Sequence, residues 1–350
     1  MNKRTALLTL EDGHVFEGFS FGWEGATAGE LVFNTGMVGY PESLTDPSYY
    51  GQILVMTYPL IGNYGVPEFK PDSLAFESDR IQVRGLVVAD YSADYCHWNA
   101  RQSLGEWLES QKIPAITGID TRALTQILRE EGTMLAKITF DDEIDYYDPN
   151  RQNVVAEVSC IEPRTYGQGK KRIALLDCGC KRSIISQLAQ HRVEILRLPW
   201  NSDLTKYDFD GLCISNGPGN PRNCEAPIAS VRLALENKIP ILGICLGNQI
   251  LALAAGAKTY KLKYGHRGQN QPVIDQTSGC CYITSQNHGF AVDDKSLPED
   301  WQIWFSNLND RTNEGLIHRS GRFMSVQFHP EAATGPLDTM FIFNRFLDIL

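Results

Sequence analysis

From residue 172 to residue 350, short apolar segments alternate with segments of helical periodicity, and this alternation constrains the fold more than any other feature. The apolar segments are RIALLDCG, VEILRLP, FDGLCISNG and IPILGIC, and helical patterns such as KRSIISQLAQH, EAPIASVRLALENK and NQILALAAGA follow them. Strands joined through helices require right-handed crossovers and a sheet covered on both faces. We therefore expect residues 172–350 to form an α/β domain with an open, mainly parallel sheet. The later strands YKLKYGH and CYITSQNHGFAV and the final helix DTMFIFNRFLDIL belong to the same domain.

Residues 1–150 have a different texture, which predicts a mixed α/β domain rich in strands. ALLTLEDGHVFEGFSFG is typical of a hairpin that turns at Asp12-Gly13. GLVVAD predicts a strand, SLGEWLESQK a helix, and GIDTRALTQILREEG an amphipathic helix capped by Asp120 or Thr121. Residues 151–171 are polar and end in Gly and Lys, so we expect a linker with one short helix at most. A chain of 350 residues fits about two such domains.

The charge and cysteine content exclude several classes of function. The chain has 32 basic and 42 acidic residues, and it contains no basic run that would bind nucleic acid or an anionic membrane surface. No apolar stretch approaches the length of a membrane span, and the N-terminal segment lacks a secretory pattern. Nine cysteines, with no pair at zinc-ribbon spacing, indicate a reduced, cytoplasmic protein without a metal site.

The segment IPILGICLGNQ places Cys245 at the junction of a strand and a helix, with Gly243 and Gly247 two positions to either side. Small flanking residues permit the sharp turn of a nucleophile elbow. Such a turn would leave the side chain exposed at the carboxyl edge of the sheet, where open α/β folds bind ligands. The helix dipole and free N–H groups there favour a thiolate. We interpret Cys245 as a nucleophile; the alternative is a buried structural cysteine.

A thiol nucleophile needs a base and a group that orients the base. Among seven histidines, His329 stands out in RFMSVQFHPE, because Pro330 ends the strand there. Glu331 lies two residues on, so an extended chain places both side chains on one side, where the carboxylate fixes the imidazole tautomer. The alternative is a surface histidine at a strand end.

The loop SNGPGNP, Ser215 to Pro221, follows another strand of the same sheet. Gly217 and Gly219 permit unusual backbone dihedrals, so the loop can direct backbone N–H groups at a developing oxyanion. A Gly/Pro turn without a further role is the alternative.

Residues 172–350 resemble the class I glutamine amidotransferase family. The resemblance rests on three motifs in this order: ISNGPGNP, GICLGNQ and QFHPEA. The resemblance implies a catalytic triad of Cys245, His329 and Glu331. The thiol would attack the side-chain amide of L-glutamine, form a γ-glutamyl thioester and release ammonia. His288 is not expected to be the base, since His329 matches that role. The resemblance also implies oxyanion and glutamine contacts from Gly217, Gly219, Leu246, Gln249, Asn287, Gly289 and Phe290.

The N-terminal half narrows this resemblance. Four segments of this half resemble the small-subunit family of carbamoyl phosphate synthetases: LEDGHVFEG, GELVFNTGMVGYPESLTDPSYYGQI, TYPLIGNYG and GIDTRALTQILREEG. The likeness covers nearly the whole chain. It implies that the N-terminal domain docks on a large synthetase subunit, in a heterodimer or a higher assembly, and that Ser48 adds a glutamine contact. The large subunit would use ATP and Mg²⁺ to make carbamoyl phosphate from bicarbonate and the delivered ammonia, for arginine or pyrimidine synthesis or both. No cofactor is expected in this chain.

Some positions depart from the family pattern. Asn248, Gln271 and Asn220 stand where His, His and Asp are usual, which puts in question the rate of glutamine hydrolysis and its coupling to the partner, but not the reaction class. Three alternative functions stay open: the glutaminase of anthranilate or GMP synthesis, a stand-alone thiol hydrolase of γ-glutamyl bonds, and a non-catalytic regulatory subunit. The first lacks such an attached N-terminal domain, and loss of Cys245 or His329 would have indicated the third.

Overall fold

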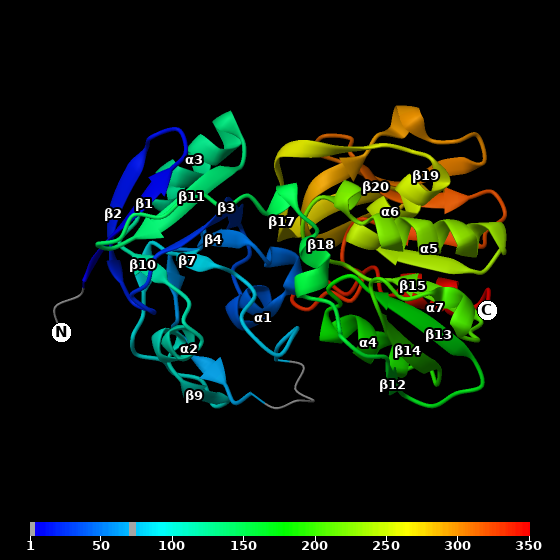
Figure 1. Ribbon diagram of the computed structural model, residues 1–350, viewed down its shortest axis with the longest axis horizontal. Helices are drawn as coiled ribbons and strands as arrows, with labels where there is room; N and C mark the ends of the chain where they lie inside the picture. The colour runs from blue at the N-terminus through cyan, green and yellow to red at the C-terminus, as the bar shows by residue number, and fades with distance from the viewer. Residues whose placement is uncertain (1–3, 70–74) are drawn as a thin grey trace. The chain divides into compact units, whose positions relative to one another are not determined.

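The computed structural model describes residues 4–69 and 75–350. The chain divides into two compact units, the first ending at Asn150 and the second beginning at Arg151 (Figure 1). Among the described residues, one hydrophobic cluster lies in the first unit and two lie in the second. Within the described ranges, no helix combines the length and the apolar character that crossing a bilayer requires.

The first unit is built on a closed barrel with the strand order β1-β11-β3-β4-β7-β10-β2. Its opening hairpin, β1 with β2, is antiparallel and turns through Asp12-Gly13 as predicted, with Gly13 at a φ of 96°. β3, β4, β7 and β10 pair in parallel, so the barrel mixes both strand directions. The barrel strands are β1 (Thr5–Leu10), β2 (Val15–Ser20), β3 (Thr27–Asn34), β4 (Gln52–Met56), β7 (Gly85–Val87), β10 (Ala115–Thr117) and β11 (Met134–Thr139).

The two longer helices of the first unit begin at side-chain caps, and Asp120 is a cap that the sequence predicted. α2 (Leu104–Ser110) starts with a capping box, in which Ser103 and Glu106 each accept a hydrogen bond from the other's backbone N–H. α3 (Thr121–Glu131) starts at Asp120, which accepts a hydrogen bond from Ala123 N at 2.9 Å. The shorter elements are α1 (Tyr40–Thr45), the 3-10 turn η1 (Pro47–Tyr49), β5 (Leu60–Ile61), β6 (Val66–Pro67), β8 (Asp90–Tyr91) and β9 (Ala100–Gln102).

The second unit contains a ten-stranded sheet in the order β12-β14-β13-β15-β16-β21-β20-β19-β17-β18. The run β14-β13-β15-β16-β21 is parallel, and the remaining strands extend it antiparallel on both sides. The expected α/β architecture is confirmed, with a larger antiparallel part than the sequence suggested because β17 to β21 are joined by short connections. The bounds are β13 (Arg172–Asp177), β14 (Glu194–Pro199), β15 (Gly211–Ile214), β16 (Ile241–Ile244), β17 (Thr259–Asp275), β18 (Cys281–Val292), β19 (Trp301–Asn307), β20 (Asn313–His318) and β21 (Phe323–Val326).

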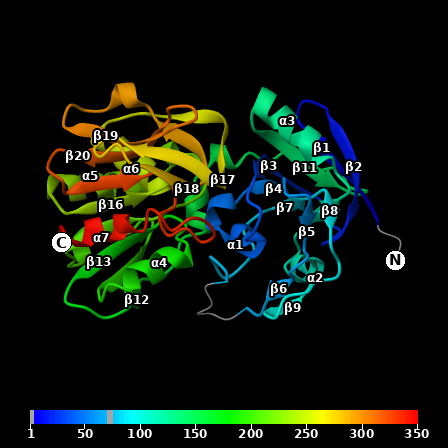
Figure 2. The same ribbon diagram turned by 180° about the vertical axis from the view of Figure 1, so that it is seen from behind.

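Helices cover both faces of the parallel strands (Figures 1 and 2). Along β13, Ile173 and Leu175 pack in one core cluster with residues of α4 and α7, whereas Ala174 and Leu176 pack in the other with residues of α5 and α6. Because both faces are buried, these strands read in the sequence as continuous apolar runs. The helices are α4 (Arg182–Ala189), α5 (Glu225–Glu236), α6 (Leu246–Ala255) and α7 (Phe341–Leu347).

Residues 151–171, expected as a linker, lie within the second unit. Val155, in the 3-10 turn η3 (Val154–Glu157), belongs to one of its core clusters, and β12 (Arg164–Tyr166) pairs antiparallel with β14 at the sheet edge. A short polar edge strand has the composition of a loop, which explains why the sequence pattern does not reveal it.

Candidate active site

Cys245 lies between the end of β16 and the start of α6, at the carboxyl edge of the parallel strands. Its backbone has a φ of 54° and a ψ of −104°, a strained conformation for a residue with a side chain. The flanking glycines are sterically required: a Cβ on Gly243 would lie 2.5 Å from Gly247 O, and one on Gly247 would lie 2.2 Å from Ile214 O. The spacing of glycines in the sequence is therefore the signature of this turn.

The sulfur of Cys245 is enclosed rather than exposed. The expectation of an exposed thiol is wrong, since the residue keeps only 2% of its accessible surface. Asn287 O lies 3.7 Å from Sγ, and Gln327 Nε2 donates to Sγ at 3.6 Å. Both groups come from segments beside the turn, and their packing covers the sulfur. The sulfur is therefore shielded from bulk solvent in this structure.

His329 and Glu331 form a buried pair just beyond β21. His329 is held in place by its backbone N–H, which donates to Ser285 O at 2.9 Å, and its Nδ1 contacts Glu331 Oε1 at 2.6 Å. Burial lowers the pKa of His329, but Glu331 and, more weakly, Cys245 raise it, to about 10 in all. The other ring nitrogen, Nε2, is buried and has no hydrogen-bond partner among the described residues. His329 Nε2 therefore keeps its hydrogen-bonding capacity for a further group, while Nδ1 is held by Glu331.

Lys181 is a site residue that the sequence pattern did not single out. Its Nζ lies 3.0 Å from Glu331 Oε1 and donates to Ala333 O at 3.1 Å, and both charged side chains are buried. Burial raises the pKa of Glu331, but Lys181 and then His329 lower it, to about 2. Lys181 follows β13, so its place at the carboxyl edge of a parallel strand was the signal that could have pointed to it.

The loop Ser215–Pro221 packs beside the thiol turn. Ser215 Oγ accepts from Cys178 N at 2.9 Å, and Asn216 Oδ1 accepts from Lys181 N at 3.0 Å. A Cβ on Gly217 would lie 2.0 Å from Cys178 O and 2.8 Å from a methyl of Leu246. The glycine therefore lets the loop approach the first residue of α6, and Gly219 turns the chain at a φ of 82°.

The residues expected to bind glutamine fall into two groups. Gln249 donates from Nε2 to Phe290 O at 2.8 Å, and Asn287 lies against Cys245, so α6 and β18 bring these residues together with Gly289 beside the thiol. Ser48 belongs to the first unit, where it lies buried in η1 and its N–H donates to Asp46 Oδ1 at 2.8 Å.

One of the unusual residues, Asn248, has a clear local role. Asn248 accepts from Ser325 Oγ at 2.7 Å and donates to Gln327 Oε1 at 3.0 Å, and Gln249 Nε2 donates to the same Oε1 at 3.0 Å. Because Oε1 of Gln327 receives two donors, its amide nitrogen must face Cys245 Sγ. Gln327 is thus a second contact of the thiol that the sequence did not indicate.

Asn220 and Gln271 lie away from the sulfur contacts described above. The side chain of Asn220 accepts from Arg222 N at 3.1 Å and caps the 3-10 turn η5 (Pro221–Asn223). Gln271 lies in β17, where its carbonyl accepts from Thr284 Oγ1 at 2.8 Å.

Comparison with known proteins shows which family this chain belongs to. Residues 8–138 match the family described as "Carbamoyl-phosphate synthase small chain, CPSase domain", and residues 174–349 match "Glutamine amidotransferase class-I". The "Carbamoyl phosphate synthase arginine-specific small chain" of Saccharomyces cerevisiae is 49% identical over 98% of this chain and 88% of its own length. The chain belongs to the carbamoyl-phosphate synthase small-chain family. The resemblance drawn from the motifs is confirmed.

Other relatives of this small chain differ in length. The arginine-specific small chain of Neurospora crassa is also 49% identical, over 98% of this chain and 79% of its own length. The mitochondrial "Carbamoyl-phosphate synthase [ammonia]" of Homo sapiens is 49% identical over 99% of this chain, which spans only 24% of the length of that relative. The small-chain sequence is therefore found both as most of a protein and as a quarter of one.

Proposed function

We propose that this small chain is a glutaminase that supplies ammonia to a carbamoyl phosphate synthetase. The observation that carries the proposal is the strained turn at Cys245 beside a buried His329–Glu331 pair, in a chain of the small-chain family. A positioned thiol with a nearby imidazole–carboxylate pair supports acyl transfer through that thiol.

In the proposed first half-reaction, the thiol proton of Cys245 has already passed to His329 Nε2, as the raised pKa of His329 favours, and Sγ attacks the amide carbon of glutamine. The negative charge that develops on the oxygen is met by the N–H of Leu246, at the start of α6, and by the Gly217–Gly219 loop. His329 returns its proton to the leaving nitrogen, the C–N bond breaks, and ammonia and a γ-glutamyl thioester result. Gln327, which donates to Sγ at 3.6 Å, steadies the sulfur through this cycle.

In the second half-reaction, His329 takes a proton from water, which attacks the thioester carbon. The S–C bond breaks, glutamate leaves, and the proton taken from water stays on His329 opposite the freed sulfur. Glu331, kept anionic by Lys181 and His329, balances the imidazolium that forms in both halves.

The ammonia is proposed to pass to a large subunit, which would use ATP and Mg²⁺ to convert bicarbonate and ammonia to carbamoyl phosphate. Free ammonia in neutral water is mostly protonated and no longer nucleophilic, so a lasting complex, a heterodimer or an assembly of heterodimers, is part of the proposal. The two fungal relatives are named arginine-specific, which favours arginine synthesis over pyrimidine synthesis as the destination. A cytoplasmic location is proposed with it.

The test is Cys245→Ser in the complex of this chain with a candidate large subunit. Glutamine-dependent carbamoyl phosphate synthesis should fall by at least about 10⁴-fold, because the nucleophile is lost, while synthesis from added ammonia should persist. Persistent use of glutamine by the variant would contradict the assignment of the nucleophile. If the wild-type complex used only ammonia, the chain would be a non-catalytic subunit, an outcome that the "[ammonia]" in the human relative's name makes worth measuring.

A further inference from the structure

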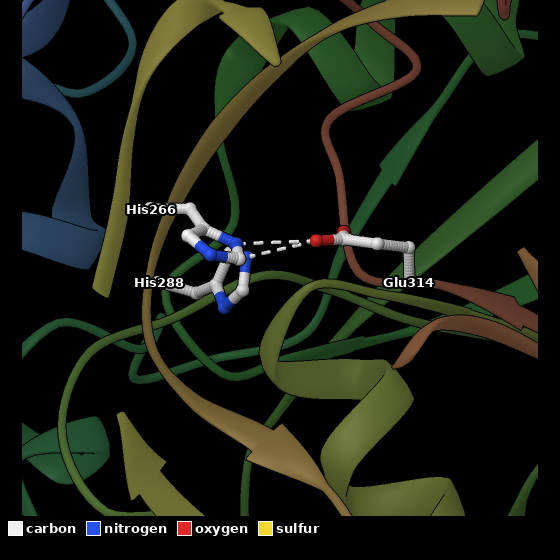
Figure 3. A group of neighbouring side chains, drawn as sticks. All are labelled: His266, His288 and Glu314. Carbon is white, nitrogen blue, oxygen red and sulfur yellow. Dashed lines mark hydrogen bonds and ion pairs between the residues drawn. The ribbon is translucent and has the colours of Figure 1, made fainter. Parts of the chain in front are cut away.

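A second cluster of titratable side chains lies behind the strand that carries the proposed glutamine contacts, and the proposed mechanism does not use it. His266 of β17, His288 of β18 and Glu314 of β20 converge from three strands of the sheet (Figure 3). All three side chains are buried, and one donor atom from each lies within 4.8 Å of the other two. The sequence pattern gave no hint of it, because the three residues lie far apart in the chain.

Both ring nitrogens of His288 face oxygens that can only accept hydrogen bonds. Nδ1 lies 2.9 Å from Phe290 O, and Nε2 lies 3.3 Å from Gln286 Oε1 and 3.8 Å from Glu314 Oε1. The orientation of Gln286 is fixed, because the Thr284 hydroxyl donates to a backbone carbonyl and so must accept from Gln286 Nε2, at 3.1 Å. The amide oxygen of Gln286 therefore points at the imidazole.

His266 presents the same pattern. Its Nε2 lies 2.8 Å from Asp310 Oδ2 and its Nδ1 lies 3.2 Å from Glu314 Oε1. Asn307 Nδ2 is 3.5 Å from Nδ1, at the limit of a hydrogen bond, and donates to Glu314 Oε1 at 3.2 Å. The second oxygen of Glu314, Oε2, is buried and has no hydrogen-bond partner in the described part of the chain.

Counting hydrogens shows what the cluster lacks. Four imidazole nitrogens face acceptor oxygens, but two neutral imidazoles carry only two N–H groups. If His266 donates from Nε2 to Asp310 and His288 donates from Nδ1 to Phe290 O, two lone pairs and the Glu314 carboxylate are left facing one another. A cation must lie between them, either as added protons or as a metal ion.

We propose that this position binds a divalent transition-metal ion, zinc in the first place, through His266 Nδ1, His288 Nε2 and the Glu314 carboxylate. Two imidazoles and a carboxylate are a zinc-type donor set, and they favour zinc over magnesium or calcium. The outer contacts fit as well, since metal-bound histidines donate their other N–H to a carboxylate or a carbonyl, as Asp310 and Phe290 O are placed to accept. One divalent ion also neutralises the two carboxylates, and Glu314 Oε2 or a water completes the coordination.

Such an ion would tie β17, β18 and β20 together directly behind Asn287 and Gly289, the neighbours of His288. Zinc binding itself does not depend on the proposed glutaminase function. The role of the ion does rest on the proposed function: the ion would hold the glutamine-contacting strand in position and would be structural rather than catalytic.

The experiment measures zinc bound to the full chain. Because exposed thiols are able to ligate zinc, the chain used in this experiment carries serine in place of Cys96, Cys280 and Cys281. After removal of metal with a chelator and dialysis against buffered free zinc, elemental analysis should find about one zinc per chain. Glu314→Gln and His288→Gln should each weaken binding by at least about tenfold, whereas His14→Gln, at an exposed histidine beside Asp12, should not.

Cobalt provides a second readout that does not depend on the variants folding. The unaltered ligand set should give the visible absorption of four-coordinate cobalt without the near-ultraviolet band of thiolate ligation. Zinc should also raise the thermal midpoint of the chain, as binding to the folded state alone requires. A chain that retains less than about a tenth of an equivalent of zinc, with a midpoint indifferent to zinc and chelator, would show that protons fill the cluster and would overturn the proposal. Loss of zinc with intact thioester formation at Cys245 would leave the proposed function standing.

Discussion

At the residue scale, the candidate site depends on three buried charges in a row: Lys181, Glu331 and His329. Glu331 Oε1 is within 3.0 Å of the lysine and 2.6 Å of the imidazole, so the carboxylate is shared between two cationic groups. A shared buried carboxylate is sensitive to the loss of either partner, because the remaining charges lose their compensation in a medium of low dielectric constant.

Lys181→Met keeps most of the side-chain volume but removes the charge, and we expect it to lower the free energy of unfolding by about 3–5 kcal/mol. Denaturant titration followed by circular dichroism measures the change. Lys206→Met is the matched control, since Lys206 lies 3.6 Å from Asp203 in an exposed pair and its loss should leave the free energy of unfolding nearly unchanged. Equal effects of the two substitutions would mean that the buried pair contributes no more than a surface one.

At the element scale, the decisive structure is the junction of β16 and α6. The turn forces Cys245 to a φ of 54°, and it can do so because neither neighbouring glycine has a side chain. The side chain of Cys245 is therefore positioned by the backbone of a strand and a helix, which are more rigid than a loop.

Gly243→Ala should destabilise the chain by about 1–3 kcal/mol and lower glutaminase activity, because its Cβ would press on Gly247 O at 2.5 Å and shift the thiol. Gly279→Ala is the control. A Cβ there meets nothing within 4 Å, so only its φ of 73° is strained and activity should be kept. Unfolding curves and initial rates of glutamate release report the two effects separately, and an active Gly243→Ala variant would argue against the geometric role of the turn.

At this scale, the sequence could predict the features that depend on residues close together in the chain. The cap of α3, the hairpin at Gly13 and the apolar parallel strands were visible because neighbouring residues determine them. The closure of the first-unit barrel was not, because it depends on β2 pairing with β10 about a hundred residues later. β17 was expected only up to His266, since Gly265 and the later register shifts interrupt its pattern while the strand continues to Asp275.

The same distinction applies to the site. Cys245, His329 and Glu331 stand in short motifs with a physical reason for each spacing. Lys181 and Gln327 approach these residues only through the order of strands in the sheet, and the His266–His288–Glu314 cluster unites three strands. A single sequence does not reveal such non-local contacts.

At the scale of the whole molecule, the site couples stability to pH. The pKa of Glu331 falls from 4.5 to about 2 on folding, so its stabilising contribution is complete above pH 4.5 and is lost as the pH falls towards 2. The pKa of His329 rises from 6.5 to about 10, so its contribution is complete below pH 6.5 and is lost as the pH rises towards 10. The pair therefore contributes most between about pH 4.5 and 6.5.

Glu331→Gln tests this coupling. The free energy of unfolding of the wild-type chain minus that of the variant should be largest between pH 4.5 and 6.5 and should shrink on both sides, because the variant lacks the charge that shifts both pKa values. Chemical denaturation at a series of pH values gives the difference directly. A difference that does not vary with pH would show that the two groups are not coupled in the folded chain.

The burial of the site sulfur has a practical consequence for anyone who handles this protein. Cys96, Cys280 and Cys281 are exposed, whereas Cys245 is enclosed with four other buried thiols. Air oxidation should thus begin with crosslinks between molecules through the outer sulfurs, and a colorimetric thiol count on the folded chain should register those three first. In an aged, crosslinked sample, the Cys245 thiol should then still be intact. A reducing agent that breaks the outer crosslinks should return the protein to its original state.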